Sequence, residues 1–297
     1  MICVMKHYLQ PAFLAPPPAL EISEAEYFSL KRSMTILNAA FAFEENYDLL
    51  VGNYLEIENS ALLISASSMV RRRHEYQEMF ELKAELNRRA VNFLSSARLF
   101  VDQIPQRVRE CGSDAKEIVE ALSVEYDSWF EYRFMEALRN HVQHSGLAVH
   151  SLSVSGKWVP PGRLGRNEFA IEVFSQKKFL ALDKNFKKLV LQECPEQVNV
   201  LTAVRRYVES LSKVHGVARK ILSKAILEAR NLCEIAIKRY GESAEITTGL
   251  TAFTSSIHDP ETAFPVFLDW DDVRIKLSQR NPVLINLSKR VVLSAAS

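Results

Sequence analysis

Glycine, proline and cysteine are scarce in this chain of 297 residues, and each scarcity excludes a class of protein. The 9 Gly and 11 Pro residues are too few for the turn-rich strands of an all-β sandwich or barrel. The 4 cysteines are scattered, form no metal-type pair and are too sparse for a disulfide scaffold. This cysteine usage predicts a reducing compartment, and we expect a cytoplasmic protein.

Long apolar runs and an excess of charge of one sign are also missing. No run reaches the roughly 18 apolar residues of a membrane-spanning helix, so we expect no membrane segment. The net charge of +1 excludes a uniformly basic nucleic-acid-binding protein, but it leaves room for a local basic cleft. With 47% hydrophobic and 25% charged residues, the composition is that of a globular protein with a sizeable core.

Four long stretches carry apolar residues at three- and four-residue spacing, which is typical of helices packed in a bundle. The first opens with Ser23-Glu24-Ala25-Glu26, the pattern of a capping box. Pro105 and Gly112 are expected to end the second, and Gly216 is expected to bend or break the fourth. The predicted helices cover about 23–55, 71–104, 113–146 and 195–241.

Between the third and fourth stretches the apolar period changes from about 3.6 to 2. Residues 147–155 and 168–174 are rich in β-branched and aromatic side chains, which predicts a β-hairpin or small sheet. We expect an irregular leader over 1–22, a helical domain over 23–241 with a β insertion at about 147–174, and a C-terminal extension over 242–297. The fold class is therefore mainly α: a long up-and-down four-helix bundle with a small β insertion and a mixed α/β tail, whose elements are predicted at 264–270 (strand), 271–277 (helix) and 283–293 (strand or arm).

One short motif stands out at the end of the third predicted helix: Arg139-Asn140-His141-Val142-Gln143-His144. It resembles the signature of the HEPN family (higher eukaryotes and prokaryotes nucleotide-binding), in which an Arg, usually followed by Asn, Asp or His, precedes a His by four to six residues. The resemblance covers this hexapeptide and the helical organisation of about 23–241. It implies a metal-independent endoribonuclease, and a role as a toxin or defence effector.

The chemistry of the three polar residues suits that activity. A histidine whose ordinary pKa is near 6.5 can accept or donate a proton at cellular pH, so His144 is the expected acid or base. The guanidinium of Arg139 can bind a phosphate through two hydrogen bonds and offset its growing charge. Asn140 is expected to orient the other two. No metal-ligand spacing occurs, and we expect neither a metal nor another cofactor.

Three neighbours complete the predicted site as substrate-binding or orienting residues: Glu136, His141 and Arg133. Glu136 lies one helical turn before Asn140 and is the candidate for holding Arg139 or His144 in place. His141 is in register with the apolar face of the helix, so packing against the core is the simpler interpretation. For Arg133, pairing with a nearby Glu is the simpler interpretation.

Helical geometry constrains the pair. Residues five apart lie about 140° apart around a continuous helix, so Arg139 and His144 diverge unless the helix frays before Ser145 or the arginine reaches around. Alternatively, two copies of the motif face each other across a two-fold axis. The resemblance implies that arrangement, a homodimer with RNA as its substrate. It also implies an antitoxin or regulatory partner, although Gly146 stands where some toxins of the family carry a modifiable Tyr.

Two other interpretations stay open. The motif is also compatible with a polar helix face ending in a cap, where histidine is favoured by the helix dipole. A non-catalytic, HEPN-like binding or scaffold module would need the bundle and a dimer interface but no reaction. The basic runs are likewise either solvated helix faces or a phosphate track; they are Arg71-Arg72-Arg73, Arg88-Arg89, Lys177-Lys178, Lys187-Lys188 and Arg205-Arg206.

Overall fold

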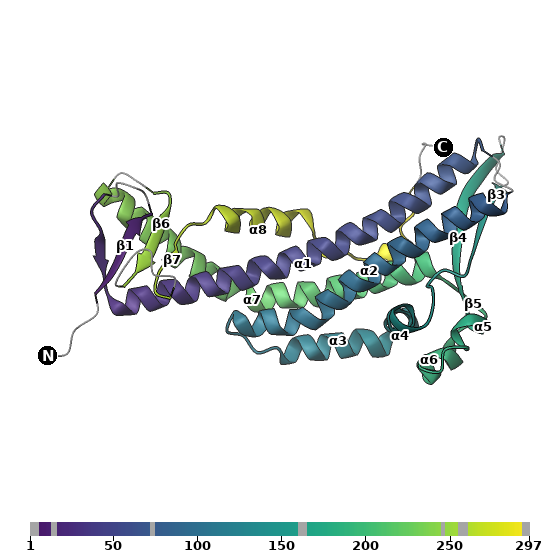
Figure 1. Cartoon of the computed structure of the whole chain (residues 1–297), viewed down its shortest axis with the longest axis horizontal. Helices are drawn as coiled ribbons and strands as arrows, with labels where there is room; N and C mark the ends of the chain where they lie inside the picture. The colour runs from purple at the N-terminus through teal and green to yellow at the C-terminus, as the bar shows by residue number, and fades with distance from the viewer. Residues whose placement is uncertain are drawn as a thin grey trace. The chain divides into compact units, whose positions relative to one another are not determined.

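The structure, a computed structural model, describes residues 6–12, 17–71, 75–159, 165–244, 247–254 and 261–292. These residues form eight α-helices, seven strands and one 3-10 helix, so the mainly helical prediction is confirmed (Figure 1). In this part of the chain no helix combines the length and the apolar character needed to cross a membrane. Arg72, Arg73 and the loop expected around Pro161 lie outside the described residues.

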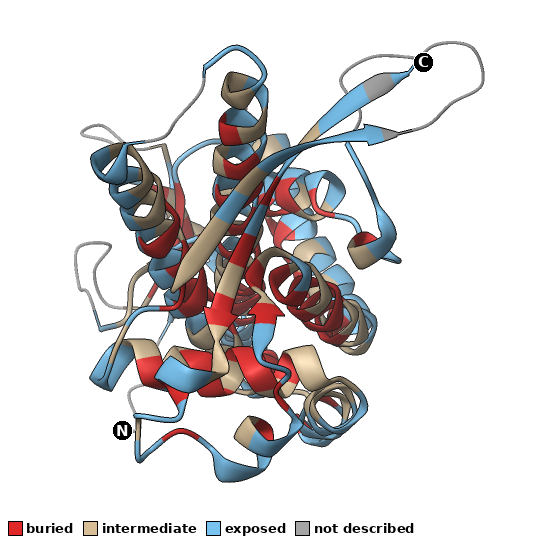
Figure 2. Cartoon of the chain, turned by 90° about the vertical axis from the view of Figure 1, so that its right-hand side faces the viewer, coloured by how far each residue is buried: buried red, intermediate tan, exposed pale blue. Residues whose placement is uncertain are grey.

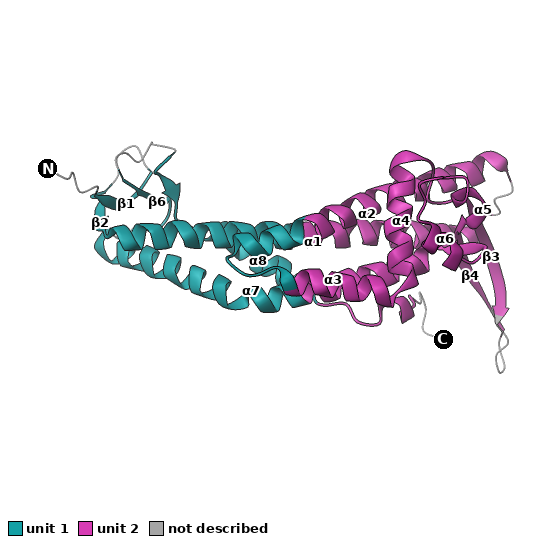
Figure 3. Ribbon diagram, turned by 90° about the horizontal axis from the view of Figure 1, so that it is seen from below, with its two compact units in different colours: residues 1–45, 103–116, 217–282 teal, residues 46–102, 117–216, 283–297 magenta. Residues whose placement is uncertain are grey.

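The chain divides into two compact units, coloured separately in Figure 3. Unit 1 comprises residues 1–45, 103–116 and 217–282, and unit 2 comprises residues 46–102, 117–216 and 283–297. Three helices contribute residues to both units: α1 (Glu24–Ser68), α2 (Tyr76–Glu110) and α7 (Val200–Ala244). We describe each unit by itself.

Unit 1 contains a small antiparallel sheet in the order β2-β1-β6-β7. Residues expected to be an irregular leader instead form β1 (His7–Pro11) and β2 (Leu20–Ile22). β1 also pairs with β6 (Leu250–Phe253), with Leu9 opposite Ala252, and β6 pairs with β7 (Phe264–Pro265). The leader was missed because its strand pairs with residues some 240 positions away, which local periodicity does not reveal.

α8 (Asp269–Arg280) in unit 1 confirms the helix expected near 271–277 and extends it at both ends. It is tied to α7 by a buried carboxylate. Asp271 is fully buried and accepts hydrogen bonds from Arg230 at 2.6 Å and from Arg274 at 2.5 and 3.0 Å. The strand expected over 264–270 shrinks to β7. The 283–293 segment forms no strand among its described residues, only the 3-10 helix η1 (Leu287–Lys289).

Unit 2 is built around aromatic side chains from several helices. The Tyr47 ring of α1 stacks on His215 of α7 at 3.8 Å, and its hydroxyl donates to Ser212 at 2.8 Å. Tyr207 of α7 packs edge-on against Phe93 of α2 and Tyr132 of α4. Figure 2 shows buried residues on the helix faces that are turned toward other helices. The up-and-down order of a four-helix bundle stays a prediction.

The third predicted helix is two helices, α3 (Lys116–Ser128) and α4 (Phe130–His144). The break lies at Trp129, whose backbone is extended, with φ −127° and ψ 123°. Arg133 stabilises it by donating to the carbonyls of Tyr126 and Asp127 at 2.9 and 2.8 Å, which satisfies two of the last four acceptors of α3. The expectation of one helix was wrong because no Gly or Pro marks the break.

Two expected helix breaks are absent. α2 continues through Pro105 to Glu110 because Ile104 and Val108 prolong its buried face, and it ends before Gly112, whose φ is +80°. α7 runs without interruption through Gly216. A Cβ on Gly216 would lie 2.9 Å from Cγ2 of Val283, so the glycine provides room for a passing segment.

The predicted β-hairpin is confirmed as β3 (Ser151–Val159) and β4 (Arg166–Gln176), which are antiparallel. A strand that was not expected, β5 (Gln197–Asn199), pairs with β4 and precedes α7 directly. Two short helices, α5 (Lys177–Leu180) and α6 (Lys188–Glu193), follow β4. The sheet therefore brings the α5–α6 segment back against α4, which contacts α6.

Candidate functional site

The motif occupies the last two turns of α4. The helix buries Tyr132, Phe134, Met135, Ala137, Leu138 and His141 on one face. It is regular through His144 and ends where the backbone N–H of Ser145 donates to the His141 carbonyl at 2.8 Å. The helix does not fray before Ser145, so Arg139 and His144 leave it about 140° apart.

Arg139 and Asn140 are brought together, and His144 is not part of that contact. Nη1 of Arg139 donates to Oδ1 of Asn140 at 2.9 Å. Arg139 forms no ion pair with any carboxylate of the described residues, and its Nε is buried without a hydrogen-bond partner there. Asn140 and His144 are exposed. The guanidinium therefore keeps its charge available for an anion.

His141 is a structural residue. Its side chain is 4% exposed, and Nδ1 lies 2.8 Å from Oδ2 of Asp183, which is 5% exposed. Because a carboxylate only accepts, Nδ1 carries the proton and donates. This hydrogen bond, followed by one from the backbone N–H of Asn185, lowers the pKa of Asp183 below its ordinary value. The pair acts as a clamp that fastens the end of α4 to the segment between α5 and α6, while the predicted substrate-binding or orienting role of His141 stays a prediction.

Gly146 makes this clamp possible, which gives a first prediction. A Cβ on Gly146 would lie 2.6 Å from Nε2 of His141, so Gly146→Ala displaces a ring that is buried against it. We expect a loss of about 1–3 kcal/mol in the free energy of unfolding, the usual cost of overpacking. Urea unfolding followed by circular dichroism measures it.

Gly52 of α1 supplies the matched control, because a Cβ there meets nothing within 4 Å. Gly52→Ala is expected to stabilise the chain by up to about 1 kcal/mol through helix propensity. Equal and small effects of the two substitutions would show that His141 is not held by its contact with Gly146.

The segment that follows α4 is also held in place by a residue of α2. The side-chain amide of Asn87, which is buried, accepts from the backbone N–H of Val149 at 2.8 Å and donates to the Val149 carbonyl at 3.0 Å. It thus pairs with a peptide group as a neighbouring strand would. Asp183 thus holds His141 within the motif, and Asn87 holds Val149, five residues beyond the end of the motif.

His150 comes next and is held uncharged. Its Nδ1 accepts from the backbone N–H of Gln176 at 3.0 Å and lies 3.2 Å from the Ser175 hydroxyl, while its ring stacks on Phe179 at 4.9 Å. Burial, and then the nearby His141 and Lys83, lower the pKa of His150 from 6.5 to about 4. Protonation of Nδ1 would break its bond with Gln176.

This depressed pKa predicts a pH dependence of stability. His150 takes up a proton near pH 6.5 in the unfolded chain and only near pH 4 in the folded chain, so its contribution to stability falls as the pH falls through that range and is constant above it. His150→Asn keeps an acceptor but no titratable group, and we expect it to flatten the curve between these two values. Unfolding temperatures of both proteins from pH 7 to pH 4 test this; parallel curves would contradict it.

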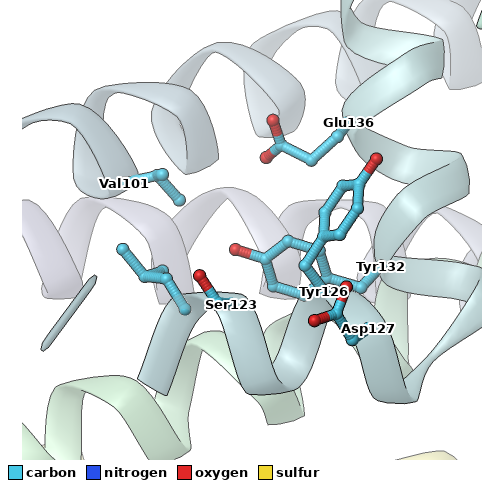
Figure 4. Close-up of a pocket in the computed structure, with 7 residues that line it drawn as sticks. Val101, Ser123, Tyr126, Asp127, Tyr132 and Glu136 are labelled. Atoms are coloured by element: carbon cyan, nitrogen blue, oxygen red, sulfur yellow. The ribbon is translucent and has the colours of Figure 1, made fainter. Parts of the chain in front are cut away.

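Glu136 bonds to residues other than Arg139 and His144, the partners expected for it. Its carboxylate accepts a short hydrogen bond from the Tyr207 hydroxyl and one from Arg98 at 3.4 Å. Burial and this carboxylate raise the pKa of Tyr207 well above its ordinary value, so the phenol stays protonated. Glu136 also lines a hollow of about 270 Å³ with residues from α2, α3 and α4 (Figure 4), among them Val101, Ser123, Tyr126, Asp127 and Tyr132.

Most of the described arginines of the basic runs are neutralised within the fold. Arg133, which lies outside these runs, likewise donates to Glu193 at 2.6 Å, besides bonding to the end of α3. The arginines of the Arg88-Arg89 and Arg205-Arg206 pairs bond to carboxylates of Glu85, Glu56, Glu58 and Glu209. By contrast, neither Lys187 nor Lys188 forms an ion pair with the described residues. Lys177 and Lys178 likewise form no ion pair with the described residues, so the phosphate track stays a hypothesis that concerns these lysines rather than the paired arginines.

Sequence reasoning missed Asp183 and Asn87. Both are single polar residues, and nothing in their local sequence predicts that Asp183 bonds to His141, 42 positions away, or that Asn87 bonds to Val149, 62 positions away. Across the described residues, no three or more His, Cys, Asp or Glu side chains are grouped as a metal site. Searches of family models, curated proteins and solved structures find no match to this chain.

Proposed function

We propose that the chain is a HEPN-like, metal-independent endoribonuclease whose catalytic residues are Arg139, Asn140 and His144. The observation that carries this proposal is the state of Arg139. Its guanidinium bonds to Asn140 and to no carboxylate of the described residues, within the last two turns of a helix that also presents an exposed histidine. Six other arginines of unit 2 bond to carboxylates, namely Arg88, Arg89, Arg98, Arg133, Arg205 and Arg206. Arg139 does not, so its charge is suited to binding a phosphate.

The reaction that these groups support is attack by a ribose 2′-oxygen on the adjacent phosphorus. Neutral His144 accepts the 2′-hydroxyl proton as the new P–O2′ bond forms. The P–O5′ bond breaks, and the imidazolium returns the proton to the departing 5′-oxygen. Arg139 offsets the charge that grows on the phosphate oxygens. The products are a 2′,3′-cyclic phosphate and a 5′-hydroxyl.

A two-fold arrangement brings the two groups to one phosphate. Arg139 and His144 leave the same continuous helix about 140° apart, so within one chain both reach one phosphate only if the arginine reaches around the helix. In a homodimer with the ends of α4 facing each other, His144 of one copy and Arg139 of the other meet across the axis. A toxin or defence effector restrained by an antitoxin or regulatory protein is the biological role that the family resemblance suggests.

The test is an RNA cleavage assay of the purified full-length chain at neutral pH with excess chelator. We expect cleavage that leaves 2′,3′-cyclic phosphate and 5′-hydroxyl ends, identified by phosphatase and kinase labelling. Cleavage that requires a divalent metal, or that leaves 5′-phosphate ends, contradicts the proposal.

The divergence of Arg139 and His144 also favours a second candidate, a non-catalytic helical binding or scaffold module. In that case RNA binds to the end of α4 without turnover. Its signature is RNA affinity that falls in an Arg139→Ala variant while the bound RNA is recovered uncut.

A further inference from the structure

A second hollow lies beside the start of α4, apart from the motif. It has a volume of about 530 Å³ and is formed by the end of α3, the start of α4 and α6. Pockets of this size accept small organic ligands. The lining residues that matter here are Tyr126, Asp127, Arg133, Lys187, Lys188 and Val190.

The positive charge of this pocket comes from two lysines. Nζ of Lys187 lies 3.1 Å from the Tyr126 hydroxyl and 5.1 Å from the centre of its ring, which keeps the ammonium at the pocket. Lys188 is exposed and, like Lys187, has no ion pair among the described residues. Arg133 is already compensated by Glu193. Two uncompensated ammonium groups on adjacent residues fit a phosphate.

The rest of the pocket fits a base. Tyr126 offers an aromatic ring, and its edge-to-face contact with Tyr132 at 6.0 Å fixes the orientation of that ring. Val190 is buried and provides an apolar wall. The exposed carboxylate of Asp127 is an acceptor for the amino or imino N–H groups of a base edge.

We propose that this pocket binds a nucleotide, with the base stacked on Tyr126 and the phosphate held by Lys187 and Lys188. The bound nucleotide is either a free nucleoside monophosphate or one unit of an RNA strand. The RNA source rests on the proposed function: Arg133 and His144 lie within about 20° of each other around α4 and about 16 Å apart along it, so one strand can reach both.

The test measures binding by the full chain carrying His144→Ala, which prevents cleavage. Isothermal titration compares the four nucleoside monophosphates, ribose 5-phosphate and inorganic phosphate, and fluorescence anisotropy measures a labelled RNA oligonucleotide. Two variants probe the pocket, Tyr126→Leu for the base and Lys187→Ala for the phosphate. Lys184→Ala is the matched control, because Lys184 is an exposed lysine three positions away that does not line the pocket.

We expect a nucleoside monophosphate to bind more tightly than ribose 5-phosphate, and both pocket variants to weaken it roughly tenfold, as the loss of one stacked base does. Lys184→Ala binds as the parent does. If the protein binds a free nucleotide but not RNA, the proposal holds and the ligand of the pocket is a free nucleotide.

Ribose 5-phosphate binding as tightly as every nucleotide overturns the proposal, since the site would then hold phosphate alone. Absence of nucleotide and RNA binding at millimolar concentration also overturns it. These outcomes do not depend on cleavage. If the wild type cuts RNA and the pocket variants bind and cut RNA as well as the wild type does, the proposed function stands and the nucleotide pocket is ruled out.

Discussion

Replacement of His144 by Ala is expected to lower the rate of RNA cleavage by about 10²–10⁴-fold, the usual contribution of a positioned acid or base. The side chain is exposed at the last residue of α4 and forms no hydrogen bond or ion pair with the described residues. Its removal should therefore leave the unfolding temperature unchanged. Single-turnover cleavage of a labelled RNA, alongside thermal unfolding, measures both quantities.

Gln143→Ala is the matched control for His144→Ala. Gln143 is the preceding residue on the same helix and is also exposed. Its variant should cleave RNA at the wild-type rate. If His144→Ala also cleaves RNA at the wild-type rate, His144 takes no part in the reaction. If both variants lose activity to the same extent, the end of the helix matters rather than the imidazole.

Replacement of Asp271 by Ala is expected to cost about 3–5 kcal/mol in the free energy of unfolding, because it leaves buried guanidinium charge uncompensated. Asp271 is fully buried and is the shared acceptor for Arg230 and Arg274, and the Arg274 side chain is only 10% exposed. The loss concerns unit 1, to which α8 belongs. Urea titration followed by circular dichroism measures it.

The neighbouring Asp272 supplies the control for Asp271. It also accepts from Arg230, at 2.8 Å, but its side chain is 55% exposed. Asp272→Ala is expected to cost at most about 1 kcal/mol, as exposed ion pairs do. A small effect of Asp271→Ala, similar to that of Asp272→Ala, would show that the buried carboxylate does not hold α8 in place.

The sequence predicts the helices well where a single apolar face decides the outcome. α1 begins after Ser23 as expected, and its Ser23 hydroxyl accepts from the backbone N–H of Glu26 at 3.2 Å. Prediction fails where a contact distant in sequence decides. Pro105 does not end α2, because the buried face continues beyond it, and the α3–α4 break depends on the capping side chain of Arg133.

The candidate site, too, is predicted from the sequence only in part. The type and spacing of Arg139, Asn140 and His144 suffice to single them out, and their placement at the end of a helix is as predicted. The roles of Glu136, His141 and Arg133 depend on Tyr207, Asp183 and Glu193, which come from three other segments. Apolar periodicity does not predict such polar pairs, so they are found only in the three-dimensional structure.

The central claim is that Arg139 and His144, which diverge on one helix, act on one phosphate across a two-fold axis. The most direct test is to co-express Arg139→Ala and His144→Ala chains with different tags, purify the mixed dimer through both tags, and measure RNA cleavage. We predict that each single variant is inactive and that the mixed dimer, with one of two sites intact, recovers about half of the wild-type rate. A mixed dimer as inactive as its two parents would contradict the claim.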